Sequence, residues 1–233
     1  MVAQEKALIV GVGAGLSASL ARLFHKEGMA VALASRHPDQ LAGLCGDIGA
    51  TAYGCDASDP ESVDALFATV DADMGAPNLV VYNASNRARG PVEELDPEAV
   101  RTAIMISCFG GFLVAQAAAK RMIPAGNGTI LLTGASASVK GYANSSSFAM
   151  GKFGLRGLAQ SMARELQPKN IHVGHFVIDG GIMVTKDDER STARGEDGTL
   201  HPDAIADSYL HVHRQHRSSW TWEMELRPWV ENF

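Results

Sequence analysis

Short apolar runs alternate with helical patterns from the first residues of the chain onward. The apolar runs predict strands at residues 7–10, 31–35, 50–55, 78–84, 129–135, 171–178 and 221–226. Leucines at helical spacing predict a helix from Leu16 to a stop at Gly28 and a longer one through Leu155 that Pro168 ends. Because strands and helices alternate, the sequence predicts an α/β fold whose parallel sheet is covered by helices on both faces.

Two further helices have clear start signals. The stretch Ser58-Asp59-Pro60-Glu61 offers a capping side chain and a proline in the first turn, and Pro97 opens another helix. Residues 185–218 are polar and less regular, and we predict that they form a substrate lid. With 233 residues and 46% hydrophobic content, residues 1–233 are expected to fold as a single domain.

The net charge indicates which kinds of binding partner are expected, and the cysteine content indicates the compartment. A net charge of -6 disfavours nucleic acid and anionic membrane, which attract basic patches, so we expect a small-molecule substrate. The three cysteines lack a Cys-x-x-Cys pair, which argues against a disulfide framework or zinc knuckle and favours the reducing cytoplasm. We expect no signal sequence and no membrane span, since no apolar run approaches about 18 residues.

A glycine-rich turn joins the first predicted strand to the first helix. Gly11, Gly13 and Gly15 would let the backbone approach a pyrophosphate, while the helix start at Leu16 and Ser17 supplies free amide donors and a partial positive charge. Such turns also occur without ligands, but this one directly follows a buried strand. The pattern therefore predicts a dinucleotide site.

The end of the second strand indicates which dinucleotide binds. Ser35-Arg36 stands where a carboxylate would hold the ribose hydroxyls of NAD. A guanidinium beside a small hydroxyl suits the 2'-phosphate of NADP, because arginine grips phosphate through two charge-assisted hydrogen bonds. We predict that NADP(H) is preferred and NAD(H) is possible; the alternative is that Arg36 is only a solvated charge.

With Asp56 after the third strand, Asn83-Ala84-Ser85 after the fourth, and Lys152 in a later helix, the chain resembles the short-chain dehydrogenase/reductase family over nearly its whole length. The resemblance implies a Rossmann-like, doubly wound parallel sheet of about seven strands that binds NAD(P). Ser17 takes the place of the family's third glycine. The residues implied to bind the cofactor are Gly11, Gly13, Gly15, Leu16, Ser17, Ser35, Arg36, Asp56, Ala57, Asn83, Ala84, Ser85, Lys152, Gly180 and Ile182.

The same resemblance implies that some of the family's catalytic residues are absent from this chain. The family uses Tyr-x-x-x-Lys, and here Lys152 keeps the lysine position while Phe148, which cannot donate a proton, takes that of the tyrosine. Ala135 stands 13 residues before Phe148, where the family has a serine, with Ser136 next to it. Ser107 stands in the asparagine position. Loss of a positioned acid costs about 10²- to 10⁴-fold in rate.

Three features are candidates to replace the missing acid. Tyr142 lies on a predicted loop and would reach the substrate oxygen, unless it is an ordinary loop aromatic. Ser136, Ser138 or the run 145–147 would polarise a carbonyl, although serine runs are common in plain loops. Asp179 replaces the family's Pro-Gly and would place a carboxylate near the nicotinamide, or would simply form a turn.

Two functions of different class remain open. The first is an NADP(H)-dependent oxidoreductase with an atypical proton donor, acting on a carbonyl, alcohol or activated alkene. The second is a catalytically degenerate dinucleotide-binding protein that serves as a sensor or partner subunit. The resemblance implies a homodimer or homotetramer built on helices at about 107–122 and 148–167. His211, His213 and His216 are expected on a solvent-facing or lid helix rather than at a metal, since their spacing does not converge.

Overall fold

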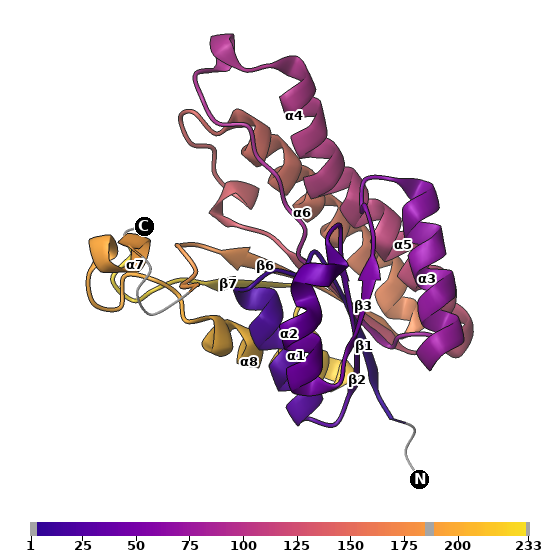
Figure 1. Ribbon diagram of the computed structural model, residues 1–233. Coiled ribbons are helices and arrows are strands. Elements are labelled where there is room, and N and C mark those ends of the chain that lie inside the picture. Colours follow the sequence, from indigo (N-terminus) through magenta and orange to yellow (C-terminus); the bar gives the residue numbers. More distant parts are fainter. Residues whose placement is uncertain (1–3, 185–188, 232–233) are drawn as a thin grey trace.

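The computed structural model describes residues 4–184 and 189–231 (Figure 1). Its strands form one sheet, in the order β3-β2-β1-β4-β5-β6-β7, and every neighbouring pair is parallel. The strands are β1 (Lys6–Val10), β2 (Ala30–Ser35), β3 (Thr51–Gly54), β4 (Leu79–Tyr82), β5 (Gly128–Thr133), β6 (Ile171–Ile178) and β7 (Glu223–Leu226). Each lies within or overlaps one of the seven predicted apolar runs, so the prediction of a seven-stranded parallel sheet is confirmed.

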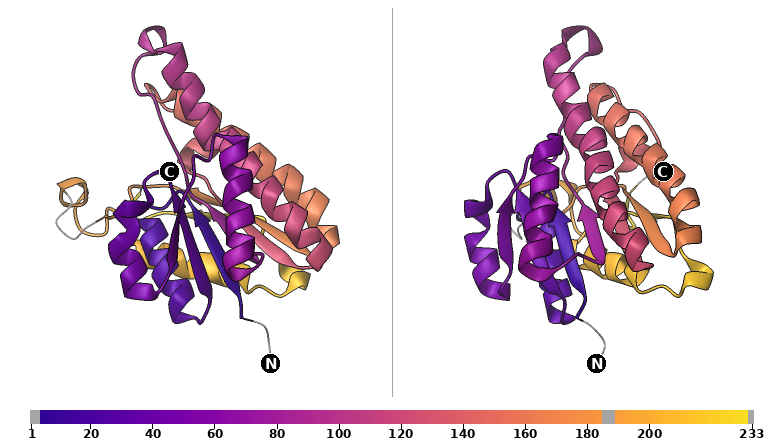
Figure 2. Two further views of the ribbon diagram at one scale, coloured as in Figure 1. Left: turned by 45° about the vertical axis from the view of Figure 1, so that its right-hand side comes forward. Right: turned by 90° about the vertical axis from the view of Figure 1, so that its right-hand side faces the viewer.

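Helices cover both faces of the sheet (Figure 2). One apolar core is formed with α1 (Leu16–Lys26), α2 (Ala42–Ile48) and α8 (Pro202–His213), and it includes Phe24 and Tyr209. The other core is formed with α3 (Pro60–Met74), α5 (Gly110–Ala125) and α6 (Ser146–Leu166), and it includes Phe67 and Leu155. The predicted doubly wound arrangement is therefore confirmed. The start of α3 is capped as expected, with the Asp59 side chain accepting from the Glu61 amide.

The helices α4 (Pro97–Ile104) and α5 follow one another through a π-helical turn at Met105–Phe109. Figure 1 shows α4 projecting beyond the sheet. By length and composition alone, the continuous run Pro97–Ala125 would be able to span a membrane, which the sequence analysis did not expect. Half of its apolar window is buried inside the protein, and core helices of this kind pass the same test.

The prediction of a lid over 185–218 needs correction. Residues 185–188 lie outside the described part of the chain, α7 spans Glu189–Arg194, and α8 is a layer of the core rather than a cover. Ile205, Ala206, Tyr209 and Val212 of α8 are buried against the sheet and α1. Among the described residues of the predicted lid, Arg194 and Thr199, which precede α8, line the cleft described below.

The solvent-facing assignment is also wrong for His213. Its side chain is only 8% exposed, and its two ring nitrogens lie 2.9 Å from Thr129 Oγ1 and 3.0 Å from Glu5 Oε1. Burial lowers the pKa of His213, although Glu5 opposes that shift. His211 and His216 are exposed, and no group of three or more metal-ligating side chains occurs in the described residues.

Candidate functional site

A cleft of about 900 Å³ opens at the carboxyl ends of the central strands. The order of strands reverses between β1 and β4, and in sheets of this kind ligands bind outside the strand ends at that point. Of the predicted site residues, those lining the cleft are Gly11, Gly13, Gly15, Leu16, Ser17, Asn83, Ser85, Ser136, Tyr142, Phe148, Lys152, Gly180 and Ile182. Residues distant in sequence therefore meet in one cleft.

The first turn of the cleft depends on glycine. Gly11 has a φ of 90°, and a Cβ atom there would lie 2.2 Å from the backbone nitrogen of Ala84. Gly13, by contrast, faces open space. Helix α1 begins directly after Gly15 without a side-chain cap and without an acidic residue in its first turn. Its amino end therefore offers unpaired amides and partial positive charge to an anion in the cleft.

Ser17, which replaces the family's third glycine, ties two strand ends together. Its hydroxyl donates to the Gly11 carbonyl at 3.1 Å and accepts from Asn83 Nδ2 at 2.7 Å. The Asn83 amide donates to the Val10 carbonyl at 2.8 Å. Serine at this position therefore adds a hydrogen-bonded brace between the glycine turn and the end of β4.

The residues at the ends of β2 and β3 lie outside the lining of the cleft. Ser35 Oγ accepts from the His37 amide at 3.0 Å, and Arg36 is exposed. Hydrogen bonds from the amide and hydroxyl of Ser58 lower the pKa of Asp56, and the charge of Arg36 lowers it further. Ala57 is buried, with its backbone close to α5. Arg36 is therefore a solvent-accessible cation within electrostatic range of Asp56.

Lys152 is a buried side chain close to Phe148. Its ammonium donates to the Thr133 carbonyl at 2.8 Å and lies 5.8 Å from the centroid of the Phe148 ring. Burial, followed by the charge of Arg87, lowers the pKa of Lys152 to about 7. The guanidinium of Arg87 covers the Phe148 ring at 4.2 Å from its centroid. Two cationic side chains thus lie near the ring of Phe148.

Two buried serines clamp the loop that follows β4. Ser107 Oγ donates to the Asn86 carbonyl and accepts from the Asn86 amide, both at 3.0 Å. Ser147 Oγ donates to the Ala88 carbonyl at 2.7 Å and accepts from the Ala88 amide at 2.9 Å. Ser107, predicted as a catalytic residue, does not line the cleft; its hydroxyl is occupied with the backbone.

The candidates to replace the tyrosine are placed differently. Tyr142 is 45% exposed at the cleft, where Lys140 Nζ lies 5.7 Å from the centroid of its ring, and Ser136 also faces the cleft. Ser138 is buried, accepts from the Ala135 amide at 3.1 Å and lies 3.5 Å from His175 Nε2. Ser145, from the predicted run 145–147, lines the cleft as well, so Tyr142, Ser136 and Ser145 all place hydroxyl groups there.

The acidic candidate Asp179 is already balanced by cations. Its carboxylate lines the cleft and lies 3.4 Å from Lys140 Nζ and 3.6 Å from Arg227 Nη2. Asp179 and Gly180 follow directly after β6. The carboxylate thus reaches the cleft edge while it also holds two basic side chains.

Several cleft residues were missed from the sequence, above all Arg87, Arg89 and Arg194. Arg87 and Arg89 follow closely after Asn83, at the carboxyl end of a central strand. Since that edge of a parallel sheet gathers functional side chains, two arginines at alternate positions there were a detectable signal. Arg194 is the last residue of α7, and no local pattern in the sequence indicates that it reaches the cleft.

The fold and the site define an α/β protein of the class that binds dinucleotides at a glycine-rich turn. The family model for short chain dehydrogenases matches residues 5–194, and the chain belongs to that family. It is 33% identical over 183 residues to trans-4-hydroxycyclohexanecarboxylate dehydrogenase from Sinomonas cyclohexanicum, covering 74% of this chain and 70% of the relative. It is 27% identical to D-threitol dehydrogenase from Mycolicibacterium smegmatis, over 72% of this chain and 66% of that relative.

Solved structures give the same family. A short-chain dehydrogenase from Rhodopseudomonas palustris superposes with a TM-score of 0.84 at 33% identity, covering 97% of this chain and 99% of the other. A metagenomic short-chain oxidoreductase in complex with NADP superposes with a TM-score of 0.83 at 25% identity, with the same two coverages.

Proposed function

We propose that this protein is an NADP(H)-dependent oxidoreductase acting on a carbonyl compound, an alcohol or an activated alkene. The observation that carries the proposal is the close packing of Gly11 against Ala84 beneath an uncapped helix start, with open space at Gly13. This geometry suits a pyrophosphate bound by backbone amides. The NADP complex of a structural relative supports the choice of cofactor.

We expect different residues along the cleft to bind different parts of the cofactor. Gly13 and the start of α1 would hold the pyrophosphate, Arg36 the 2'-phosphate, and Lys152 the nicotinamide ribose. The bound cofactor would supply or accept a hydride. Lys152 would keep a positive potential around the substrate oxygen, and Tyr142 or Ser136 would donate a hydrogen bond to it.

Cofactor choice gives a direct test. NADPH is expected to raise the melting temperature more than NADH, because only NADPH carries the 2'-phosphate that Arg36 would bind. In Arg36→Ala we expect NADPH to bind about 10- to 100-fold more weakly, the usual worth of a charge-assisted hydrogen bond, with little change for NADH. Thermal shifts and calorimetric titration measure both effects. Arg22→Ala, an exposed arginine on α1 paired with Asp47, is the control; equal shifts from both nucleotides would remove Arg36 from the site.

A second function is favoured by one observation: Phe148, which we expect at the tyrosine position, lines the cleft without a proton donor of its own. A protein that binds NADP(H) without turnover, as a sensor or partner subunit, needs Arg36 and Lys152 but no acid. A panel of carbonyl compounds at several pH values separates the two functions once nucleotide binding is established. The panel should include the ketone corresponding to the alcohol named for the Sinomonas relative. Tight NADPH binding without oxidation of NADPH across the panel would favour the sensor.

We propose that the protein forms a homodimer or homotetramer through α5 and α6, in the cytoplasm, where its three free cysteines would stay reduced. The proposal is supported by large apolar side chains exposed on these helices, namely Phe112, Ile123, Met150 and Phe153. Side chains of this kind, gathered on two helices, are typical of a subunit interface.

Phe153→Glu is expected to weaken self-association by about 100-fold or more, because a twofold interface would bury the new carboxylate in both subunits. Sedimentation velocity over a range of protein concentrations measures the change. Val92→Glu is the matched control, since Val92 is 75% exposed but lies away from both helices. If Phe153→Glu sediments like the unchanged protein, α6 is not the interface.

A further inference from the structure

Among the described residues, some of the basic side chains that line the cleft have no acidic side chain nearby to neutralise their charge. Asp179 is accompanied by Lys140 and Arg227, and Arg194 lies 3.4 Å from Glu231. In the part of the chain that the structure describes, Arg87 and Arg89 line the cleft without a carboxylate in ion-pair contact. Two uncompensated arginines at one end of a cleft stand out in a chain whose net charge is -6.

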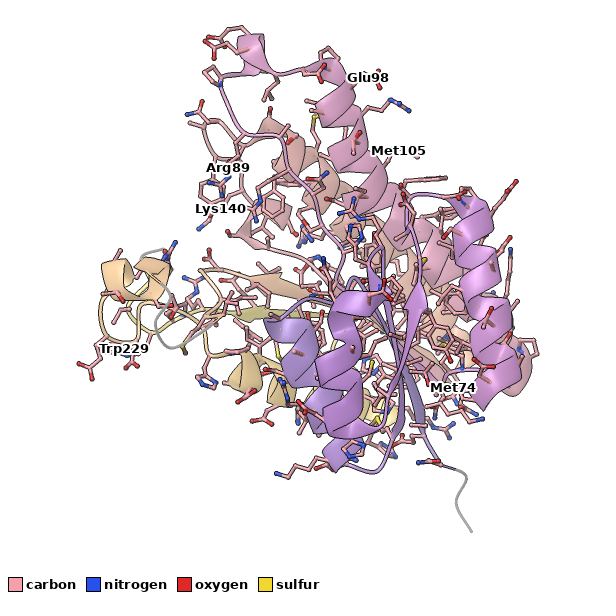
Figure 3. All side chains as sticks on the ribbon, in the orientation of Figure 1. Met74, Arg89, Glu98, Met105, Lys140 and Trp229 are labelled. Atoms are coloured by element: carbon pink, nitrogen blue, oxygen red, sulfur yellow. The ribbon has the colours of Figure 1, made fainter. Side chains whose placement is uncertain are left out.

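The clamped loop explains why both arginines face the cleft. Ser107 holds the backbone of Asn86 and Ser147 holds that of Ala88, so these two residues turn toward the protein. Side chains alternate along an extended segment, and the residues between and after the clamps point the other way. Exposure follows this alternation, with Arg87 and Arg89 exposed and their neighbours partly buried. Figure 3 labels Arg89 and Lys140 on the side of the molecule from which α7 extends.

The immediate surroundings of Arg87 favour an anion. Its guanidinium packs on the Phe148 ring, and partial burial followed by the charge of Arg89 lowers its pKa. Arg87 in turn contributes to the lowered pKa of Lys152. Cationic side chains that lie close together are stabilised when an anion enters among them. An arginine whose ring contact fixes its plane also presents its remaining donors in a defined direction, which suits a carboxylate or phosphate.

We propose that Arg87 and Arg89 form a subsite that binds the anionic group, a carboxylate or a phosphate, of the substrate. The inference deepens the proposed function and rests on it, because it places the anion beside the carbon that would react. Phe148 then serves as the apolar platform that supports Arg87, and Ser107 and Ser147 are positioning residues that act through the loop.

The test compares charged ligands with neutral ligands of the same skeleton. Levulinate is paired with its amide, and dihydroxyacetone phosphate with dihydroxyacetone, so that carboxylate and phosphate are distinguished. Each is titrated calorimetrically into the protein, with and without saturating NADP⁺. We expect at least one anion to bind 10-fold or more tightly than its neutral partner, and Arg87→Gln or Arg89→Gln to reduce that preference by about 10- to 100-fold. Arg87→Lys, which keeps the charge, should retain part of it.

The controls separate this inference from the proposed cofactor function. Arg22→Gln should bind every ligand as the unchanged protein does, and the melting temperature and NADPH affinity of Arg87→Gln establish that the cleft is intact. If NADPH binds but neither anion is preferred over its neutral partner, the subsite is refuted while the oxidoreductase proposal stands. If Arg87→Gln slows turnover of charged and neutral ketones equally without weakening either ligand, Arg87 acts on the carbonyl oxygen, and the subsite is again refuted. Failure to bind NADPH refutes the cofactor proposal alone.

Discussion

Phe148→Tyr is expected to create or raise ordinary ketone reductase activity by about 10²- to 10⁴-fold, the usual contribution of a positioned general acid. The new phenol would stand beside the buried ammonium of Lys152 and the guanidinium of Arg87. Both cations favour the phenolate, so they would lower the pKa of the phenol from its usual value of about 10. Oxidation of NADPH by a panel of neutral ketones, followed by absorbance, measures the gain.

Phe148→Leu is the matched control, because it changes the packing at the same position without adding a hydroxyl. Its activity should not exceed that of the unchanged protein. A further variant, Phe148→Tyr with Ala135→Ser, restores a second family position and is expected to gain more than the single change. If Phe148→Tyr still binds NADPH but shows no gain, the ring does not lie where the family places its tyrosine relative to substrate.

Gly11→Ala is expected to abolish NADPH binding and to lower the free energy of unfolding by about 3 kcal/mol or more, a large effect for one methyl group. The new Cβ atom would lie 2.2 Å from the backbone nitrogen of Ala84, and the φ of 90° is itself strained for alanine. Because the obstacle is backbone, β1 and β4 must separate at the point where ligand would bind. Urea denaturation and calorimetric titration with NADPH measure the two effects.

Gly13→Ala separates folding from binding. A Cβ atom at Gly13 meets nothing within 4 Å, and its φ lies outside the left-handed region. We therefore expect the free energy of unfolding to stay within about 0.5 kcal/mol of the unchanged protein. NADPH affinity should nevertheless fall, since the methyl group would occupy the path along which the pyrophosphate approaches. Equal destabilisation by the two substitutions would mean that the turn is not built as described.

The central strands of the sheet were predictable because they are buried on both faces. β6, for example, is buried at all eight of its positions, and a run such as Ile171–Ile178 stands out in any window. The α8 segment was misread because its buried positions alternate with polar ones, and His213 finds its partners on β5 and near the amino terminus. Such contacts join residues far apart in sequence, and no local pattern reports them.

The glycine turn and the candidate catalytic residues of the cleft also differ in how far the sequence predicts them. The glycine turn was predictable because Gly11 and Ser17 act through the strand and helix that flank them. The candidate catalytic residues were less predictable. The hydroxyl of Ser107, for example, is hydrogen-bonded to the backbone of Asn86 and does not line the cleft. Which way Ser107 turns depends on the course of a separate loop. The roles assigned to the catalytic residues stay predictions, and the experiments above are designed to test them.

The serine clamps bear on the thermodynamics of recognition. A segment without regular secondary structure ordinarily loses conformational entropy when a ligand orders it, at about 1 to 2 kcal/mol per backbone residue. Here the hydroxyls of Ser107 and Ser147 have already fixed the residues on either side of Arg87. The loop backbone is therefore already ordered when the chain folds. When an anion binds, the Arg87 side chain loses mainly its own rotamer freedom.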